Sequence, residues 1–264
     1  MSIDVAVIPA AGRGTRMRPA TRVVPKALIT VVDRPAIQYA VEEAARAGAK
    51  EAVVVVDLDA GHLIAQHFSL EGPLPGLEDI RVRPVVQEEP LGLGHAVFEA
   101  AEMVADRPFF CLLSDNIVRP GHDVLGEMAG GSNDGQVSVM CLRRYGDEFL
   151  DKYGFVVPTS EVVHSYVDIG GAVEKPGAGK APSNLGLVGR YLFTPEVFSV
   201  LSKTDPGFGG EIQLTDAINE LGVRGRLRGY VAEAELLDTG TPEGLMAATV
   251  VLGTHQFGPG VVET

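Results

Sequence analysis

The first half of the chain alternates short apolar runs with longer amphipathic segments. The apolar runs predict strands, and the segments between them predict helices because their apolar residues recur every three or four positions. The expected strands cover 5–8, 52–56, 81–87 and 109–113, and the expected helices cover 36–47, 61–68 and 94–104. This alternation favours an α/β fold with a mixed, mostly parallel sheet and helices on both faces.

For two of the helices, the sequence also predicts which side is buried and where the helix begins or ends. The first should be buried along an apolar stripe and end at Gly48, a residue that accepts the left-handed conformation. That stripe is made of Ile37, Ala40, Val41, Ala44 and Ala45. The last helix should start with Thr241 as its N-cap and Pro242 in its first turn. Its inward residues are expected to be Leu245, Ala248, Thr249 and Leu252.

After residue 135 the pattern changes to short β-rich pieces separated by glycine and proline. Strands are expected at 137–142, 154–157, 162–167 and 186–193, and the stripe Leu214, Ala217, Ile218 and Leu221 predicts one more helix. We expect these pieces to form a small lobe laid over the edge of the sheet. The chain, 1–264, should be a single domain, because its length suits one core. Its parts would be 1–135, 136–235 and 236–264.

Composition narrows the class of partner. The 22 Lys+Arg and 35 Asp+Glu residues give a net charge of −13, which argues against nucleic acid or an anionic membrane as the main partner. Small-molecule substrates are favoured. The N-terminus runs into an apolar strand without the regions of a signal peptide, so we expect a cytoplasmic protein. Cys111 and Cys141 lie within apolar runs and are expected to be buried thiols.

The loop after the first strand concentrates positive charge. Between Val5 and Val32 the chain has no acidic residue, and its cations are Arg13, Arg16, Arg18, Arg22 and Lys26. Gly12 and Gly14 permit positive φ angles and close backbone approach, so successive N–H groups can form a concave site for phosphate. The alternative is a glycine turn with solvated arginines. The position after a buried strand favours phosphate binding.

Two other phosphate-binding motifs fit this loop poorly. A dinucleotide fingerprint needs a helix that begins at the glycines, but Pro19 and Pro25 prevent an immediate long helix. The acid that should follow about 20 residues later is missing, because Asp57 comes too late. A Walker loop is absent as well, since no Gly-Lys-Ser/Thr follows.

Several blocks of the sequence resemble the bacterial UTP:glucose-1-phosphate uridylyltransferases. They occur in the order of that family and span most of the chain. The blocks are Ala10-Ala11-Gly12-Arg13-Gly14-Thr15-Arg16, Pro19-Ala20-Thr21-Arg22, Pro25-Lys26, Val32-Asp33-Arg34-Pro35-Ala36-Ile37-Gln38-Tyr39, Gln87-Glu88-Glu89-Pro90-Leu91-Gly92-Leu93-Gly94-His95-Ala96, Val173-Glu174-Lys175-Pro176, Ala181-Pro182-Ser183-Asn184-Leu185, Val188-Gly189-Arg190-Tyr191 and Gly210-Glu211-Ile212-Gln213-Leu214-Thr215-Asp216-Ala217-Ile218. The resemblance implies a Rossmann-like nucleotidyltransferase fold, with the nucleotide on 1–135 and the sugar phosphate on 136–235. It implies that UTP and glucose 1-phosphate give UDP-glucose and pyrophosphate by direct, Mg²⁺-assisted attack.

The resemblance assigns the loop and the next strand end to the nucleotide. The loop residues that it assigns to the nucleotide are Ala10, Ala11, Gly12, Gly14 and Thr15. Arg16 and Lys26 would hold the triphosphate and act as catalytic cations. Gln87 and the backbone at Gly92 would read the pyrimidine, since an amide offers a donor and an acceptor together. His95 is expected to be structural, helping to cap the following helix.

The resemblance places the sugar phosphate on the second half. Lys175, the third expected catalytic residue, would grip the phosphate, and Glu174 would accept hydroxyl protons from the sugar. Gly154 and Asn184 match further sugar-contact positions. Taken without the family blocks, Glu174 and Lys175 could equally be a solvated ion pair.

Two aspartates are candidate Mg²⁺ ligands. Asp115 and Asp238 each follow an apolar run that predicts a strand, and the carboxyl ends of strands in an open sheet meet at the ligand crevice. Mg²⁺ favours one or two carboxylates together with phosphate oxygens. Alternatively, Asp115 could begin a turn and Asp238 could cap the last helix, although Thr241 is better placed for that cap.

Three departures from the family pattern keep alternatives open. Ala27 and Thr30 replace the usual glutamate and proline, and the segments around Asp115 and Asp238 look more like glucose-1-phosphate thymidylyltransferases. The chain also stops soon after Phe257, so some family contacts of the expected homo-oligomer would be lost. UTP and dTTP are therefore both candidate substrates. A cytidylyltransferase is a further alternative, but it should lack the Glu-Lys-Pro block that this chain has. An inactive nucleotide-sensing subunit is another, but it would not need the cations and aspartates that are intact here.

Overall fold

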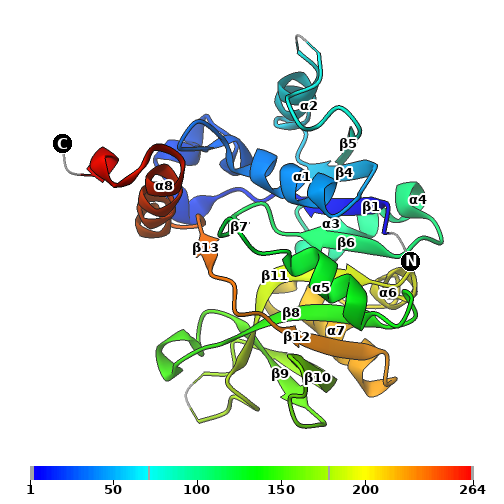
Figure 1. Ribbon diagram of the computed structural model, residues 1–264. Helices are drawn as coiled ribbons and strands as arrows, with labels where there is room; N and C mark the ends of the chain where they lie inside the picture. Colours follow the sequence, from blue (N-terminus) through cyan, green and yellow to red (C-terminus); the bar gives the residue numbers. More distant parts are fainter. Residues whose placement is uncertain (1–2, 71, 178, 263–264) are drawn as a thin grey trace.

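The computed structural model describes residues 3–70, 72–177 and 179–262. Within them, one nine-stranded sheet crosses the molecule in the order β5-β4-β1-β6-β11-β8-β12-β10-β9 (Figure 1). In that order the strands are Arg81–Val86, Glu51–Val56, Val5–Pro9, Phe109–Leu112, Leu185–Phe193, Ser138–Arg144, Leu227–Val231, Tyr166–Glu174 and Gly154–Pro158. The α/β class predicted from the sequence is confirmed.

The two halves of the chain build the two halves of this sheet. Strands β5, β4, β1 and β6 pair in parallel, as the alternating pattern predicted. Strand β11 is antiparallel to both β6 and β8, and β10 is antiparallel to β12 and β9. The expectation that the second half lies over the sheet edge is therefore wrong. Its strands extend the sheet through backbone hydrogen bonds, which a β-rich segment can form with any unpaired edge.

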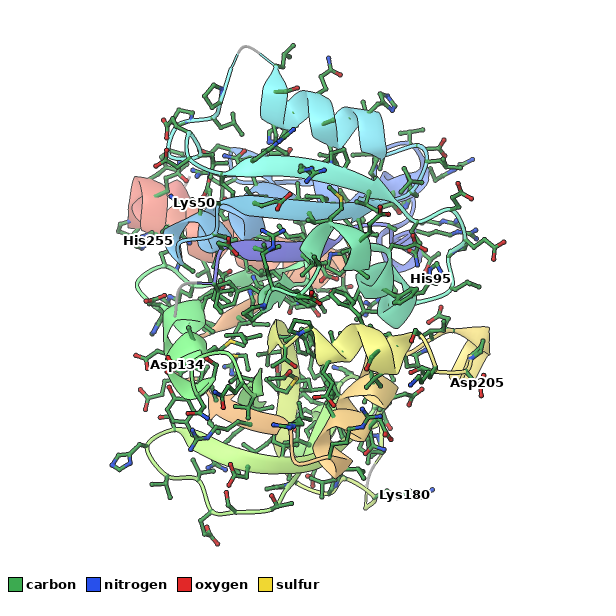
Figure 2. The ribbon with its side chains drawn as sticks, turned by 90° about the vertical axis from the view of Figure 1, so that its right-hand side faces the viewer. Lys50, His95, Asp134, Lys180, Asp205 and His255 are labelled. Atoms are coloured by element: carbon green, nitrogen blue, oxygen red, sulfur yellow. The ribbon has the colours of Figure 1, made fainter. Side chains whose placement is uncertain are left out.

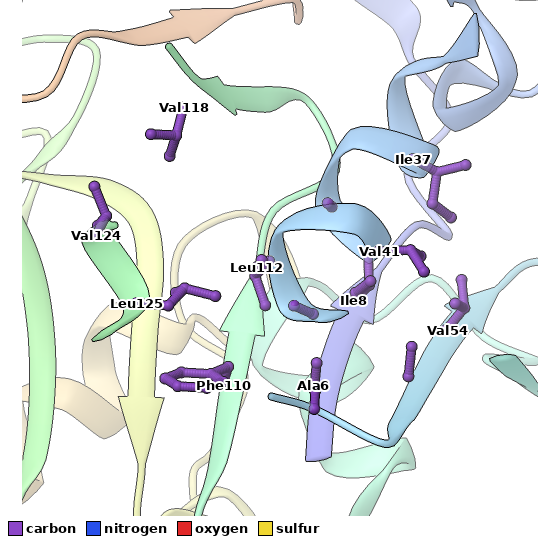
Figure 3. Close-up of a cluster of buried hydrophobic side chains, with 14 of the residues drawn as sticks. Ala6, Ile8, Ile37, Val41, Val54, Phe110, Leu112, Val118, Val124 and Leu125 are labelled. Atoms are coloured by element: carbon purple, nitrogen blue, oxygen red, sulfur yellow. The ribbon is translucent and has the colours of Figure 1, made fainter. Parts of the chain in front are cut away.

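Helices cover both faces of the sheet. One face carries α1 (Ala36–Arg46), α2 (Gly61–Ser69) and α5 (Val124–Gly131). The other carries α3 (Leu93–Glu99), α4 (Ala101–Val104), α6 (Glu196–Leu201) and α7 (Leu214–Val223). Successive residues of β1 alternate between the two cores, because strand side chains point to opposite faces in turn. Figure 3 shows Ala6 and Ile8 facing Ile37 and Val41 of α1.

The helix faces predicted from the sequence are largely confirmed. The stripe on α1 is buried, apart from the half-buried Ala45, and the four apolar residues of α7 are buried. Helix α8 (Pro242–Phe257) starts at Thr241, whose side chain accepts a hydrogen bond from the Gly244 N–H. It packs beside β13 (Leu236–Asp238) through Ala248 and Leu252 (Figure 1). The inward position predicted for Thr249 is wrong, because that residue is exposed.

Two predicted elements differ from the structure. The helix expected at 94–104 is interrupted at Ala100, which separates α3 from α4. The strand expected at 162–167 is a tight turn instead, in which Val163 and Tyr166 exchange backbone hydrogen bonds and β10 begins. His164 and Ser165 have positive φ angles, which a strand does not allow, so the alternation of apolar and polar residues in this segment did not indicate a strand.

Two short ribbons complete the described chain. β7 (Asn116–Val118) pairs with β13, and β2 (Thr30–Val31) pairs with β3 (Arg34–Pro35). Both cysteines are buried and free, as predicted. Among the described residues, none of the helices combines the length and the apolar character needed to cross a bilayer.

Candidate active site

The glycine-arginine loop leaves the carboxyl end of β1 and turns back across it. The Ala10 N–H donates to the Val55 carbonyl, which ties the start of the loop to β4. Gly14 is in the left-handed conformation with a φ of 58°, and a Cβ there would lie 2.9 Å from Lys26 Cβ. Thr21 donates a hydrogen bond to the Gly14 carbonyl at 2.7 Å. Gly14 therefore allows the loop to close tightly on itself beside Lys26.

This loop forms one wall of a cavity of about 500 Å³. The opposite walls are the segments after β5 and β6 and Glu211 of the second half. The predicted nucleotide residues that line the cavity are Ala10, Ala11, Gly12, Gly14, Thr15, Lys26, Gln87, Gly92 and Asp115. Arg16 is exposed on the same loop but does not line the cavity. The volume falls in the range of typical ligand sites.

The loop cations are available to an anion. Arg13, Arg16, Arg18 and Arg22 are exposed, and none of them makes an ion pair with another described residue. Lys26 differs from them, because its ammonium group contacts the carboxylate of Asp115. Burial raises the pKa of Asp115, but the charge of Lys26 and a smaller contribution from Arg16 outweigh burial, so the pKa is lowered. Asp115 is therefore ionised at neutral pH.

The two candidate metal ligands converge, as predicted. A Cβ on Gly240 would lie 2.8 Å from Asp238 Oδ1 and 3.1 Å from Asp115 Oδ2, so both carboxylates border the same small space. Asp115 lines the cavity and Asp238 does not. Two carboxylates this close together suit the preference of Mg²⁺ for carboxylate oxygens.

The reason for this convergence differs from the predicted one. Asp115 follows a strand of the large sheet, but Asp238 ends β13, which belongs to the separate ribbon. In that ribbon Asp238 lies opposite Asn116. The backbone N–H and the hydroxyl of Thr239 both donate to the Asp115 carbonyl, at 2.7 and 2.9 Å. Pairing between β7 and β13, rather than a shared sheet edge, brings the carboxylates together.

Gln87 directly follows β5 at the cavity wall, with only 6% of its surface exposed. Its Nε2 donates to the Gly92 carbonyl at 3.1 Å and lies 2.9 Å from His95 Nδ1. Both contacts involve the amide nitrogen, so the amide oxygen is the atom of Gln87 that remains for a base, and the role of Gln87 in reading the base stays a prediction. The predicted role of His95 as a helix cap is wrong, since no side chain caps the start of α3.

The second half supplies a separate polar cluster. Glu174 lies opposite Gly154 across the β10–β9 pair, and a Cβ on Gly154 would lie 3.1 Å from Glu174 Oε2. Lys175 pairs with Glu174 at 3.3 Å, and Thr215 donates to Glu174 Oε2 at 2.6 Å. Three of the four predicted sugar-phosphate residues thus lie together. Asn184 instead accepts a hydrogen bond from Arg144.

Tyr153 links this polar cluster to the two aspartates. Burial raises the pKa of the Tyr153 hydroxyl, and the negative charges of Asp238 and Asp115 raise it further. The Tyr153 carbonyl also accepts a hydrogen bond from the Lys175 N–H at 3.1 Å. Tyr153 is therefore near enough to both aspartates to feel their charges and is joined through its backbone to Lys175, and it was not identified from the sequence.

Comparison with known proteins assigns almost the whole chain to one family. Residues 5–254 match the nucleotidyl transferase family model. Over 262 aligned residues the chain is 36% identical to the UTP–glucose-1-phosphate uridylyltransferase of Bacillus subtilis, covering 93% of this chain and 89% of that protein. The chain belongs to the UTP–glucose-1-phosphate uridylyltransferase family. UTP–glucose-1-phosphate uridylyltransferase 2 of Staphylococcus saprophyticus is 35% identical, covering 94% of this chain and 91% of that enzyme.

Solved structures agree with this family assignment. A UDP-glucose pyrophosphorylase complexed with UDP-glucose has a TM-score of 0.87 at 32% identity, covering 96% of this chain and 99% of that one. The UTP-bound UGPase of Acinetobacter baumannii has a TM-score of 0.84, also at 32% identity, covering 99% and 98% of the two chains. The nucleotidyltransferase fold predicted for this uridylyltransferase-family chain is confirmed. Nucleotidyltransferases of this family generally use a divalent metal ion.

Three further residues at the site were missed in the sequence. Thr215 and Glu211 stand within a block that carried the resemblance, but nothing in the block shows what they contact. Arg190 is fully buried and donates to the Leu113 and Asn116 carbonyls, which flank Asp115. Such contacts join residues more than 70 positions apart, so sequence spacing gives no sign of them.

Proposed function

We propose that this chain transfers a uridylyl group from UTP to glucose 1-phosphate and releases pyrophosphate. The observation that carries the proposal is the match, over about nine-tenths of both chains, to enzymes named for this reaction. The cavity supports it, because a glycine loop, whose arginines make no ion pair with another described residue, faces a buried amide and an aspartate across a space of ligand size.

The proposed reaction needs no protein nucleophile and no general base. A phosphate oxygen of the sugar phosphate is already anionic and attacks the α-phosphorus of UTP in line, while pyrophosphate leaves. Catalysis then depends on positioning and on neutralising charge. We assign Arg16 and Lys26 to the triphosphate, and Lys175 to the sugar phosphate beside Glu174 and Gly154. We also assign Asn184 to the sugar, although its amide oxygen accepts a hydrogen bond from Arg144 in this structure.

We propose Mg²⁺ as the metal, held by Asp115 and Asp238 with the phosphate oxygens. The ion would neutralise charge on the triphosphate and help to orient it. Lys26 contacts Oδ2 of Asp115, the carboxylate oxygen that lies beside Gly240. A bound triphosphate would offer Lys26 a second anion.

A pyrophosphate-release assay tests the proposed reaction directly. Five nucleoside triphosphates would be combined in turn with a panel of sugar 1-phosphates, with Mg²⁺ present. We expect the highest kcat/KM with UTP and glucose 1-phosphate. A higher value with dTTP would support the thymidylyltransferase alternative, which the Leu237-Asp238-Thr239-Gly240-Thr241 segment favours. Release with no pair of substrates would leave a nucleotide-sensing role and refute the proposal.

The same assay tests the assignment of Gln87 to the base. Its amide oxygen is expected to accept a hydrogen bond from the N3–H of uracil, whereas N3 of cytosine carries no hydrogen. An unpaired buried polar group costs about 1–3 kcal/mol, so CTP should be disfavoured roughly tenfold or more. If CTP or ATP matches UTP in kcat/KM, Gln87 does not select the base.

Replacing Lys175 with alanine should affect only the sugar phosphate. Lys175 lies in the cluster of the second half, away from the lining of the nucleotide cavity. Loss of a charged hydrogen bond costs about 1.5–3 kcal/mol, so we expect KM for glucose 1-phosphate to rise at least about tenfold. Binding of UTP, measured by calorimetry, should be unchanged. Lys203→Ala, at an exposed lysine after α6, is the matched control, and an equal loss of UTP affinity in Lys175→Ala would refute this assignment.

A further inference from the structure

Three side chains form a connected chain that ends at the nucleotide cavity. Glu99 and His95 lie one turn apart on α3, and His95 Nε2 is 3.1 Å from Glu99 Oε1. The other ring nitrogen of His95, Nδ1, is 2.9 Å from the amide nitrogen of Gln87. Figure 2 labels His95 on its helix, beside the boundary between the two halves of the molecule.

One of the two hydrogen bonds that hold the Gln87 amide is made to the backbone. Its Nε2 lies 3.1 Å from the Gly92 carbonyl oxygen, which can only accept a hydrogen bond. The opposite orientation would bring two oxygens together at that distance. The nitrogen of the amide must therefore face Gly92, and its second hydrogen points toward His95.

The orientation of the amide in turn fixes the proton on His95. A nitrogen that receives a hydrogen bond from Gln87 carries no hydrogen of its own, so the proton of the neutral ring is on Nε2. That N–H points at the carboxylate of Glu99, which accepts it. Each group in the series from Glu99 to Gly92 thus has a compatible partner. Turning the Gln87 amide, or moving the ring proton of His95 to Nδ1, would by itself leave two donors or two acceptors facing each other.

The series leaves one atom of Gln87 free. Oε1 accepts no hydrogen bond from any described residue, although Gln87 lines the cavity and is largely buried. Within the described part of the chain, Arg228 Nε is the one buried side-chain nitrogen or oxygen without a partner, so Gln87 Oε1 must be open to the cavity. The wall therefore offers a fixed acceptor at this point.

We propose that His95, oriented by Glu99, is a positioning residue that holds the Gln87 amide with its oxygen toward the nucleobase. This inference rests on the proposed function and extends it to base selection. A fixed acceptor favours a pyrimidine whose N3 carries a hydrogen, as in uracil and thymine, and opposes the unprotonated N3 of cytosine. His95 acts through Gln87 and does not touch the nucleotide.

The test compares UTP, dTTP and CTP in wild type and in His95→Phe, which removes the acceptor but keeps a planar ring. The amide then keeps only its hydrogen bond to the Gly92 carbonyl and is held less firmly, so the UTP to CTP ratio of kcat/KM should fall at least about tenfold, equivalent to ~1.4 kcal/mol. The UTP to dTTP ratio should not change, because both bases carry N3–H. Loss of a merely structural residue would lower all three rates together and leave both ratios unchanged.

Three further variants keep the test decisive if His95→Phe folds poorly. Asparagine at position 95 places a carbonyl oxygen near the site of Nδ1, so His95→Asn should keep the wild-type ratio. Glu99→Leu removes the acceptor that fixes the ring proton and should lower the UTP to CTP ratio, whereas Glu99→Gln retains an acceptor and should not. A wild-type ratio in both His95→Phe and Glu99→Leu overturns the proposal.

Calorimetry of UTP and CTP binding without a sugar phosphate separates this inference from the proposed reaction. If wild type releases no pyrophosphate but binds UTP more tightly than CTP, and His95→Phe loses that difference, the reaction is wrong and the positioning role stands. If wild type is active but His95→Phe binds both nucleotides as wild type does, the positioning role is wrong and the reaction stands.

Discussion

Replacing Asp115 or Asp238 with asparagine is expected to lower kcat at least about a hundredfold while the fold stays intact. Both carboxylates border the space beside Gly240, and asparagine keeps their shape but removes the charge that would hold the metal. A hundredfold loss corresponds to roughly 2.7 kcal/mol of transition-state stabilisation. The measurement is steady-state turnover over a series of Mg²⁺ concentrations. The Mg²⁺ needed for half-maximal rate should rise in each variant.

Three controls make this result specific. Asp205→Asn changes an exposed aspartate on the loop after α6 (Figure 2), outside the lining of the cavity, and should leave turnover unchanged. Gly240→Ala keeps both charges but places a methyl group within 3.2 Å of Lys26 Nζ and of both carboxylates, so it should also weaken the response to Mg²⁺. Circular dichroism confirms folding. A folded Asp238→Asn enzyme with near wild-type turnover at limiting Mg²⁺ would remove Asp238 from the metal site.

The first half of the fold was predictable because its information is local. A parallel sheet covered on both faces needs apolar strands between amphipathic helices, and both patterns can be detected within windows of about 11–18 residues. The glycine loop was predictable for the same reason, since its cations and glycines are consecutive. The cavity residues followed from these segments, because the carboxyl ends of β1, β5 and β6 lie at one edge of the sheet.

The second half was less predictable because its strands pair over long separations. Whether a β-rich segment extends a sheet or packs over it depends on which edge remains unpaired, and the alternation of side chains is the same in both cases. The site depends on such distant pairing as well. The β7–β13 ribbon joins residues 116–118 to 236–238, and Thr215 meets Glu174 across 41 positions. The proposed role of His95 depends on the direction of an amide, which sequence patterns do not specify.

A buried ion pair supports the segment that carries Asp115. Arg190 has no exposed surface, and its guanidinium group donates to Glu43 of α1 and to the carbonyls of Leu113, Gly189 and Asn116. All five N–H groups of Arg190 are used in these contacts. The pair therefore connects α1, β11 and the segment around Asp115.

Glu43→Gln is expected to lower the free energy of unfolding by about 3–5 kcal/mol, because it leaves the Arg190 charge buried without a counter-ion. The measurement is urea denaturation followed by circular dichroism. Glu235→Gln is the matched control: it breaks the exposed pair with Arg119, with 41% and 55% of those side chains accessible, and should cost less than about 1 kcal/mol. If Glu43→Gln is as stable as this control, a hydrogen bond from Arg190 to a neutral amide suffices, and the charge of Glu43 is not what holds the segment around Asp115. Turnover measured on the same samples then shows whether the placement of Asp115 depends on the Arg190–Glu43 pair, because Arg190 donates to the carbonyls on both sides of Asp115.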